Sequence, residues 1–231
     1  MNTNKEVTLK KINKEFLKLS NLTLEQLEIL SQLLQQKESV ISPEILKIIE
    51  KNEKNINKLD LKLDDHIIKT IVLYNPLASE LRSLFAMYRI VQNLERIADR
   101  VIKMVSLKQK IMDVELYTKI IPKLNGLVKQ TVSMVQKAVF SFQKNDKNIA
   151  VSIMKEELNF HNLNSNLLNT AVKELELQVD VETLLLSITD IRSIISSLDR
   201  IGDHAHNIAE ATIYSIVGKN FTHQEIDNNQ L

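Results

Sequence analysis

Apolar side chains recur every three or four residues along almost the whole chain, with Lys, Glu, Asn and Gln between them. This spacing is typical of amphipathic α-helices, and no stretch shows the strict alternation of a β-strand. We therefore predict an all-α protein. The predicted helices cover residues 8–36, 43–74, 76–108, 114–143, 147–178 and 181–217.

Several residues indicate where these helices begin and end. Ser42-Pro43 is typical of an N-cap followed by the first helical residue, and Asn75-Pro76 is predicted to begin the third helix in the same way. Asp146 and Asp180 are predicted N-caps. Gly218 is predicted to end the last helix.

Two places are predicted to disturb a helix. The Ser20–Thr23 segment is expected to bend or interrupt the first helix, because its polar side chains compete for backbone hydrogen bonds. Pro122 is expected to kink the fourth helix or to mark its true start.

The second half of the chain repeats the first at an offset of 104 residues. Glu95-Arg-Ile-Ala-Asp99 corresponds to Asp199-Arg-Ile-Gly-Asp203, and Glu53 corresponds to Glu157. A tandem duplication follows, and an internal repeat largely decides an architecture. We predict two antiparallel three-helix bundles, over residues 1–110 and 111–219, followed by a polar tail over residues 220–231.

Acidic side chains form a stripe on one helix in each half. Asp199, Asp203 and Asn207 are spaced four residues apart, so they share one helix face, as do Glu95 and Asp99. Carboxylate and amide oxygens suit cations such as Mg²⁺, Ca²⁺, Mn²⁺ or iron. These stripes therefore predict metal sites.

A second helix in each half offers further ligands, and this makes each site resemble the carboxylate sites of other helical bundles. The complete set of predicted metal ligands is Glu53, Asn57, Glu95, Asp99, Glu157, His161, Asp199, Asp203 and Asn207. The alternative is that the acids are solvated surface residues, with Arg96, Arg100 and Arg200 as partners. Repetition in register favours metal for the Glu95–Asp99 and Asp199–Asp203 pairs, whereas both interpretations stay open for the other candidates.

The chain lacks the motifs of a catalyst. His204 and His206 are interpreted as packing or hydrogen-bonding residues, although Asp203 and His206 form an acid–His pair at the spacing used by di-iron bundles. The remaining ligands of such an enzyme are missing, as are a phosphate-binding loop and a nucleophile elbow. We predict that the protein is not an enzyme, and the alternative is a metal-dependent enzyme built on a helical bundle.

Composition excludes several classes of function and of binding site. A formal net charge of +1 argues against nucleic-acid binding. The absence of Cys excludes disulfides and thiolate metal sites. No apolar run reaches the roughly 18 residues that span a bilayer, and no signal-peptide pattern is present. We expect a cytoplasmic protein, at most peripheral to a membrane.

Leu94-Glu-Arg-Ile-Ala-Asp99 and Leu198-Asp-Arg-Ile-Gly-Asp-His-Ala-His-Asn-Ile-Ala-Glu210 resemble the twin signatures of the PhoU family of bacterial phosphate-uptake regulators. Pro76-Leu-Ala-Ser-Glu-Leu-Arg82 is similar to the Pro-x-Ala-x-Asp-Leu-Arg segment that opens the third helix of that family. The resemblance extends from about residue 8 to residue 218. It implies two three-helix bundles, commonly dimeric, with multinuclear iron or zinc clusters on the acidic stripes; Mg²⁺ or Mn²⁺ are alternatives.

The resemblance also implies a regulatory role. Proteins of this family restrain the phosphate-starvation response when phosphate is plentiful. They are thought to link the ATPase subunit of the high-affinity phosphate transporter to a sensor histidine kinase, which implies peripheral contact with membrane complexes.

Three positions depart from the family pattern. Lys103 stands where the first signature has Asn, and a cation there is expected to weaken or replace a metal in the N-terminal half. His161 replaces Asp or Asn, and Glu80 replaces Asp. The C-terminal site is therefore the more strongly predicted of the two.

Overall fold

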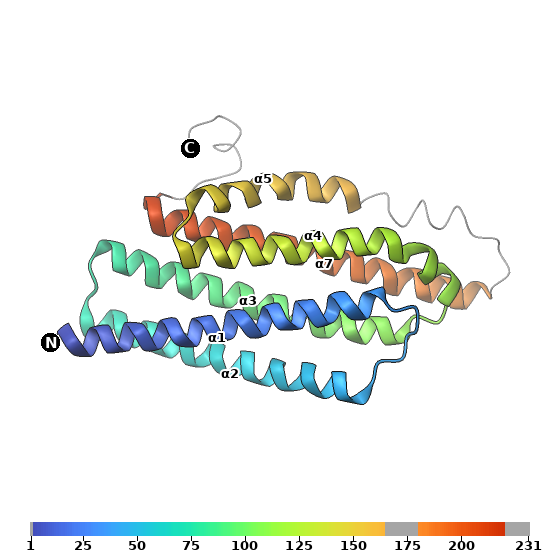
Figure 1. The fold of residues 1–231 in the computed structure, drawn as a ribbon, viewed down its shortest axis with the longest axis horizontal. Helices are drawn as coiled ribbons and strands as arrows, with labels where there is room; N and C mark the ends of the chain where they lie inside the picture. Colours follow the sequence, from blue (N-terminus) through green and yellow to red (C-terminus); the bar gives the residue numbers. More distant parts are fainter. Residues whose placement is uncertain (1, 165–179, 220–231) are drawn as a thin grey trace.

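The computed structural model describes the backbone of residues 2–164 and 180–219, and the side chains of residues 4–156 and 180–219. All regular structure in these ranges is helical (Figure 1), which confirms the all-α prediction. The helices are α1 (Asn2–Gln35), α2 (Pro43–Tyr74), α3 (Ala78–Lys110), α4 (Val114–Lys144), α5 (Lys147–Asn164) and α7 (Val181–Val217). The rest of the predicted 147–178 helix and the whole predicted tail lie outside the described residues.

Four of the predicted helix ends are confirmed by their hydrogen bonds. The Ser42 hydroxyl accepts from the N–H of Ile45 at 3.4 Å. The carboxylates of Asp146 and Asp180 accept from backbone N–H groups three residues further on, each at 3.1 Å. Gly218 has a φ of 77° and closes α7, because Gly adopts the left-handed conformation at little cost.

The predicted role of Asn75 is wrong. Asn75 ends α2 in the left-handed conformation, with a φ of 41°, and its N–H donates to the carbonyl of Ile71 at 3.1 Å. Asn tolerates this conformation better than most residues, and the following Pro76 cannot continue the helix. The third helix begins instead at Ala78, where a Glu80 carboxylate oxygen accepts from the N–H of Leu77.

Neither of the expected disturbances interrupts a helix. α1 is continuous through Ser20 and Thr23, whose hydroxyls donate to the carbonyls of Phe16 and Leu19 within the same helix. α4 continues through Pro122, which lies in the interior of the helix rather than at its start.

The described helices form two sets of three that run along the long axis of the molecule (Figure 1). α1, α2 and α3 pack on one another, and so do α4, α5 and α7. The two sets meet where α3 packs along α7, the most extensive pairing of helices, and where α1 packs on α4. The predicted pair of three-helix bundles is confirmed. The division at residue 110 into separate domains stays a prediction.

α3 and α7 run antiparallel. Moving forward along α3, Phe85 contacts Tyr214, Arg89 pairs with Glu210, and Asn93 contacts Asn207. The partner on α7 thus moves backward as the residue on α3 moves forward.

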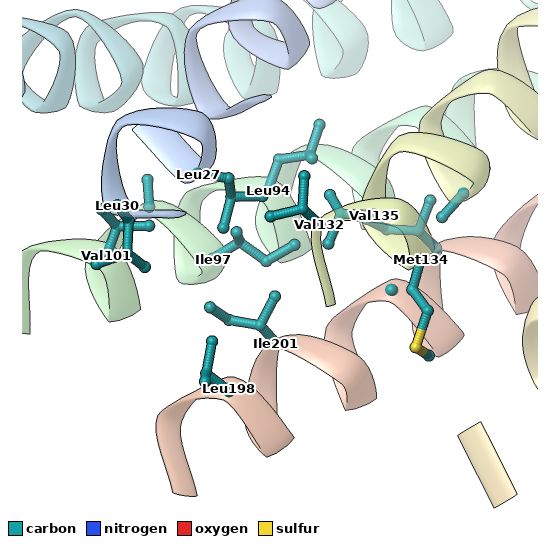
Figure 2. Packing of buried hydrophobic residues seen from close by; sticks show 14 of the residues in the cluster. Leu27, Leu30, Leu94, Ile97, Val101, Val132, Met134, Val135, Leu198 and Ile201 are labelled. Atoms are coloured by element: carbon teal, nitrogen blue, oxygen red, sulfur yellow. The ribbon is translucent and has the colours of Figure 1, made fainter. Parts of the chain in front are cut away.

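One hydrophobic core runs through both halves. Ile97 of α3 and Ile201 of α7 occupy equivalent positions in the repeat, and neither is accessible to solvent. Figure 2 shows them among apolar side chains from four helices. The neighbours labelled there include Leu27 and Leu30 of α1, Leu94 and Val101 of α3, Val132 and Val135 of α4, and Leu198 of α7.

A buried lysine adds a polar connection between the halves. The Lys108 ammonium, at the end of α3, donates to the carbonyls of Gln36 and Glu38 at 2.8 Å each. It also lies 4.1 Å from the ring centroid of Tyr117 in α4, whose hydroxyl donates to the Leu34 carbonyl at 2.7 Å. These contacts join the loop after α1, the end of α3 and the start of α4.

Within the described ranges, no helix has both the length and the apolar character that a membrane crossing requires.

Candidate metal centre and adjoining cationic hollow

Helices α2 and α3 bring five carboxylates together on the N-terminal bundle. We call this group the acid cluster; its members are Glu53, Asp60 and Asp64 of α2 and Glu95 and Asp99 of α3. The structure therefore places three predicted ligands, Glu53, Glu95 and Asp99, in one neighbourhood. The fourth, Asn57, lies one turn after Glu53 on α2, and its side chain lowers the pKa of Glu53.

Burial and mutual repulsion perturb the pKa values of Glu53 and Glu95. Burial raises the pKa of Glu95, and the negative charges of Asp99, Asp60 and Glu53 raise it further. Burial and the charge of Asp99 likewise raise the pKa of Glu53, against opposing hydrogen bonds from Gln26 and Asn57. Like charges close together favour protonation, or a cation between them.

Burial also perturbs Asp60 and Asp64, the other two α2 carboxylates of the acid cluster. Burial, with the charge of Asp64, raises the pKa of Asp60 to about 6. Burial also raises the pKa of Asp64, although Gln92 donates to its Oδ2 at 3.0 Å. Among the described residues, Glu53 Oε2, Asp60 Oδ1 and Asp64 Oδ1 are buried without a hydrogen-bond donor. Such oxygens are costly to bury.

The chemistry of the acid cluster fits a metal cation. Its donors are the oxygens that hard and borderline cations prefer, and a cation would satisfy the three orphaned oxygens and relieve the repulsion. In the parts of the chain with described side chains, no three acids or histidines converge closely enough to form a coordination shell. The acids thus lie as neighbours whose side chains would have to turn toward a shared ion.

The C-terminal stripe is described only in part. Asp199 and Asp203 are half-buried on α7, and Arg200 donates to Asp203 Oδ2 at 3.0 Å. The side chains of Glu157 and His161, predicted to complete this site, lie outside the described residues. The C-terminal metal site stays a prediction.

Three polar side chains meet between the two halves. Asn93 Oδ1 lies 3.0 Å from His204 Nδ1 and accepts from Asn207 Nδ2 at 3.4 Å. Asn93 Nδ2 donates to the Arg89 carbonyl at 2.8 Å, which fixes the amide so that Oδ1 faces α7. An acceptor at that position requires His204 to carry its proton on Nδ1.

Next to this junction lies a hollow of about 560 Å³ lined by Arg96, Asp99, Arg100, Lys103 and His204. We call it the cationic hollow. Burial lowers the pKa of His204 to about 4, and the charges of Arg96 and Arg100 lower it further. The imidazole is therefore neutral at physiological pH. His206, by contrast, is buried in α7 at 5% exposure.

Sequence reasoning missed Asp60, Asp64 and Asn93. The four-residue spacing of Asp60 and Asp64, starting one turn after Asn57, was the same signal that identified the other stripes. Nothing in the local pattern identified Asn93, because its partners lie more than 100 residues away.

The fold and the site define a class of protein: a duplicated three-helix bundle with carboxylate stripes along its helices. The sequence model of the PhoU domain matches residues 16–107 and 124–212, one match in each bundle. The chain belongs to the PhoU family. This confirms the resemblance seen in the two signatures.

Individual relatives agree with this assignment. The chain is 28% identical over 178 residues to a phosphate-specific transport system accessory protein PhoU homolog of Burkholderia sp, covering 75% of this chain and 73% of that one. Its identity to the homolog of the same name in Clostridium acetobutylicum is 21%, over 93% and 94% of the two chains.

Two crystal structures share the fold. PhoU from Pseudomonas aeruginosa superimposes with a TM-score of 0.78 at 23% identity, over 93% of this chain and 99% of that one. The phosphate transport system regulatory protein PhoU from Streptococcus pneumoniae also has a TM-score of 0.78, at 20% identity, over 94% and 99% of the chains.

Proposed function

We propose that this protein is an accessory protein of phosphate-specific transport that restrains both phosphate uptake and the phosphate-starvation response. The observation that carries the proposal is the PhoU domain matched twice, once in each bundle, in a chain whose relatives are named for that transport system. The protein acts by binding, since its polar clusters present carboxylates and cations without an activated nucleophile.

The test is a phosphate-regulon reporter, such as alkaline phosphatase expression, in a deletion strain grown in excess phosphate. The proposal predicts strong derepression that the intact gene reverses. Unchanged repression in the deletion strain, with no second copy of the gene in the genome, would contradict it.

Metal binding is the second part of the proposal. We propose that Glu53, Glu95 and Asp99, with Asn57 and Asp60 beside them, hold iron or zinc in the N-terminal bundle. The equivalent group in the C-terminal bundle is Asp199, Asp203, Asn207, Glu157 and His161. The bound cations supply positive charge that offsets the repulsion of the acids and stabilises the packing of the ligand-bearing helices.

Elemental analysis of untagged protein, with thermal unfolding before and after metal removal, tests this proposal. The wild type should contain at least one metal ion per chain, and its Tm should fall when the metal is removed. E95Q should contain less metal, and its Tm should fall by less on metal removal. E50Q, which changes an exposed glutamate of α2, is the matched control and should behave as the wild type. Equal metal content in all three proteins would exclude the acid cluster as the site.

We also propose that the protein associates with the transporter ATPase subunit and a sensor histidine kinase, and that it forms a homodimer. An apolar stripe supports a docking role: Leu77, Leu81 and Phe85 are spaced four residues apart at the start of α3 and are 76%, 40% and 47% exposed. Contiguous exposed apolar side chains often mark interaction surfaces.

We expect L81E to weaken capture of the purified ATPase subunit, while L61E, at a 71% exposed position of α2, leaves it unchanged. Equal capture by the two variants would show that the ATPase docks elsewhere. Loss of the homodimer in L81E, with capture of the ATPase unchanged, would assign the stripe to the dimer.

A further inference from the structure

The cationic hollow gathers three positively charged side chains that form no ion pair with any described residue. Arg96, Arg100 and Lys103 lie on one face of α3, at spacings of four and three residues. In the described parts of the chain, no carboxylate lies within 4.0 Å of any of these three cations. Like charges at these spacings repel, and a bound anion would relieve that repulsion.

The hollow keeps a net positive charge when its other residues are included. Asp99 is the single acid among the lining residues of the hollow. Three cations against one carboxylate leave an excess of two positive charges around a space of about 560 Å³. That charge complements a doubly charged oxyanion, and Arg is well suited to bind phosphoryl oxygens through paired N–H groups.

His204 adds selectivity. Its Nδ1 carries the proton and is engaged by Asn93, so Nε2 is the acceptor nitrogen of the ring. Hydrogen phosphate can donate its proton to such an acceptor, whereas sulfate has none to donate near neutral pH. A site with three cations and this acceptor nitrogen therefore favours phosphate over sulfate.

The repeat makes this hollow specific to the N-terminal half. At the offset of 104 residues, the counterparts of Arg96, Arg100 and Lys103 are Arg200, His204 and Asn207. The second half thus offers one permanent cation where the first offers three. Lys103 is also the residue that departs from the family signature.

We propose that the cationic hollow between α3 and α7 binds a phosphate-type oxyanion, either free hydrogen phosphate or the terminal phosphoryl group of a small molecule. Because the lining combines Arg96, Arg100 and Lys103 of α3 with His204 of α7, an anion bound here contacts both halves. The hollow can bind an oxyanion whether or not the protein regulates phosphate uptake, so failure of the binding test would leave the reporter prediction untouched.

Isothermal titration calorimetry on the full chain tests the proposal, after metal is stripped with a chelating resin. The titrants are inorganic phosphate, pyrophosphate and sulfate at constant ionic strength. K103N and R100Q should each weaken phosphate binding about tenfold or more, since each removes one charge-assisted contact. K47N removes an exposed lysine of α2 and should stay within about twofold of the wild type.

Each result of the titrations supports or overturns part of the proposal. Phosphate binding stronger than sulfate binding supports the role of His204, and stronger binding of pyrophosphate identifies a larger phosphorylated ligand. D99N should tighten binding, because it removes the opposing carboxylate. Absence of binding, binding that vanishes with the metal, or an equal effect of K103N and K47N in proteins of unchanged circular dichroism would overturn the proposal.

Discussion

At the scale of single residues, Asn93 carries an unusual share of the contact between the bundles. Its amide has both a donor and an acceptor, so it satisfies the Arg89 carbonyl on its own helix while it accepts from His204 and Asn207 on α7. It is 8% exposed, so water can replace few of these bonds. A residue of this kind fixes the register of two antiparallel helices.

We therefore expect N93A to lower the free energy of unfolding by about 1–3 kcal/mol, the cost of leaving buried partners unsatisfied. Urea denaturation measures the change. N13A, at an exposed position of α1, is the control and should lie within about 0.5 kcal/mol of the wild type. Equal midpoints for the two variants would show that the Asn93 contacts add nothing to stability.

Lys108 should make the stability of the protein depend on pH, because burial lowers its pKa from 10.5 to about 8. The folded state then binds this proton more weakly than the unfolded chain, so stability should rise as the pH increases from about 8 toward 10.5. Between pH 7 and 9.5 the wild type should gain about 1–2 kcal/mol relative to K108M. Denaturation at a series of pH values measures this difference, and parallel stability profiles would contradict it.

At the scale of helices, local chemistry was sufficient to predict most boundaries. Four helix ends depend on hydrogen bonds to residues no more than four positions away, at Ser42, Asp146, Asp180 and Gly218. Signals this local can be recognised in a sequence. Asn75 was misassigned because Asn-Pro fits both the end of one helix and the start of the next. The choice between them depends on how far α2 can continue before its apolar face loses its packing.

Two glycines allow a matched test at this scale. Gly126 lies inside α4, and an added Cβ would meet no other atom within 4 Å. G126A should therefore stabilise the protein by about 0.5–1 kcal/mol, which raises the Tm by roughly 1–3 °C. G218A should lower the Tm, because the φ of 77° at that position strains any residue with a Cβ. Thermal unfolding followed by circular dichroism measures the Tm of both variants. A lower Tm for G126A would contradict the prediction and show that the fold needs the flexibility of Gly126 in α4.

At the scale of the whole molecule, the sequence was less informative. Periodicity identifies the apolar face of each helix but not the helix that covers it, so the pairing of α3 with α7 and the roles of Asn93 and Asp60 came from the structure. The duplication did predict the two bundles and the grouping of Glu53 with Glu95 and Asp99. It could not predict that the halves would share one core, because that depends on how residues of both halves, such as Ile97 and Ile201, join one buried cluster.

We propose that the protein needs its acid cluster in order to restrain the phosphate-starvation response. The most direct measurement is complementation of the deletion strain, in excess phosphate, with genes encoding the wild type, the triple variant E53Q/E95Q/D99N and the control E50Q, at equal protein levels. We expect the wild type and E50Q to restore repression of alkaline phosphatase and the triple variant to leave it derepressed. Full repression by the triple variant would contradict the account.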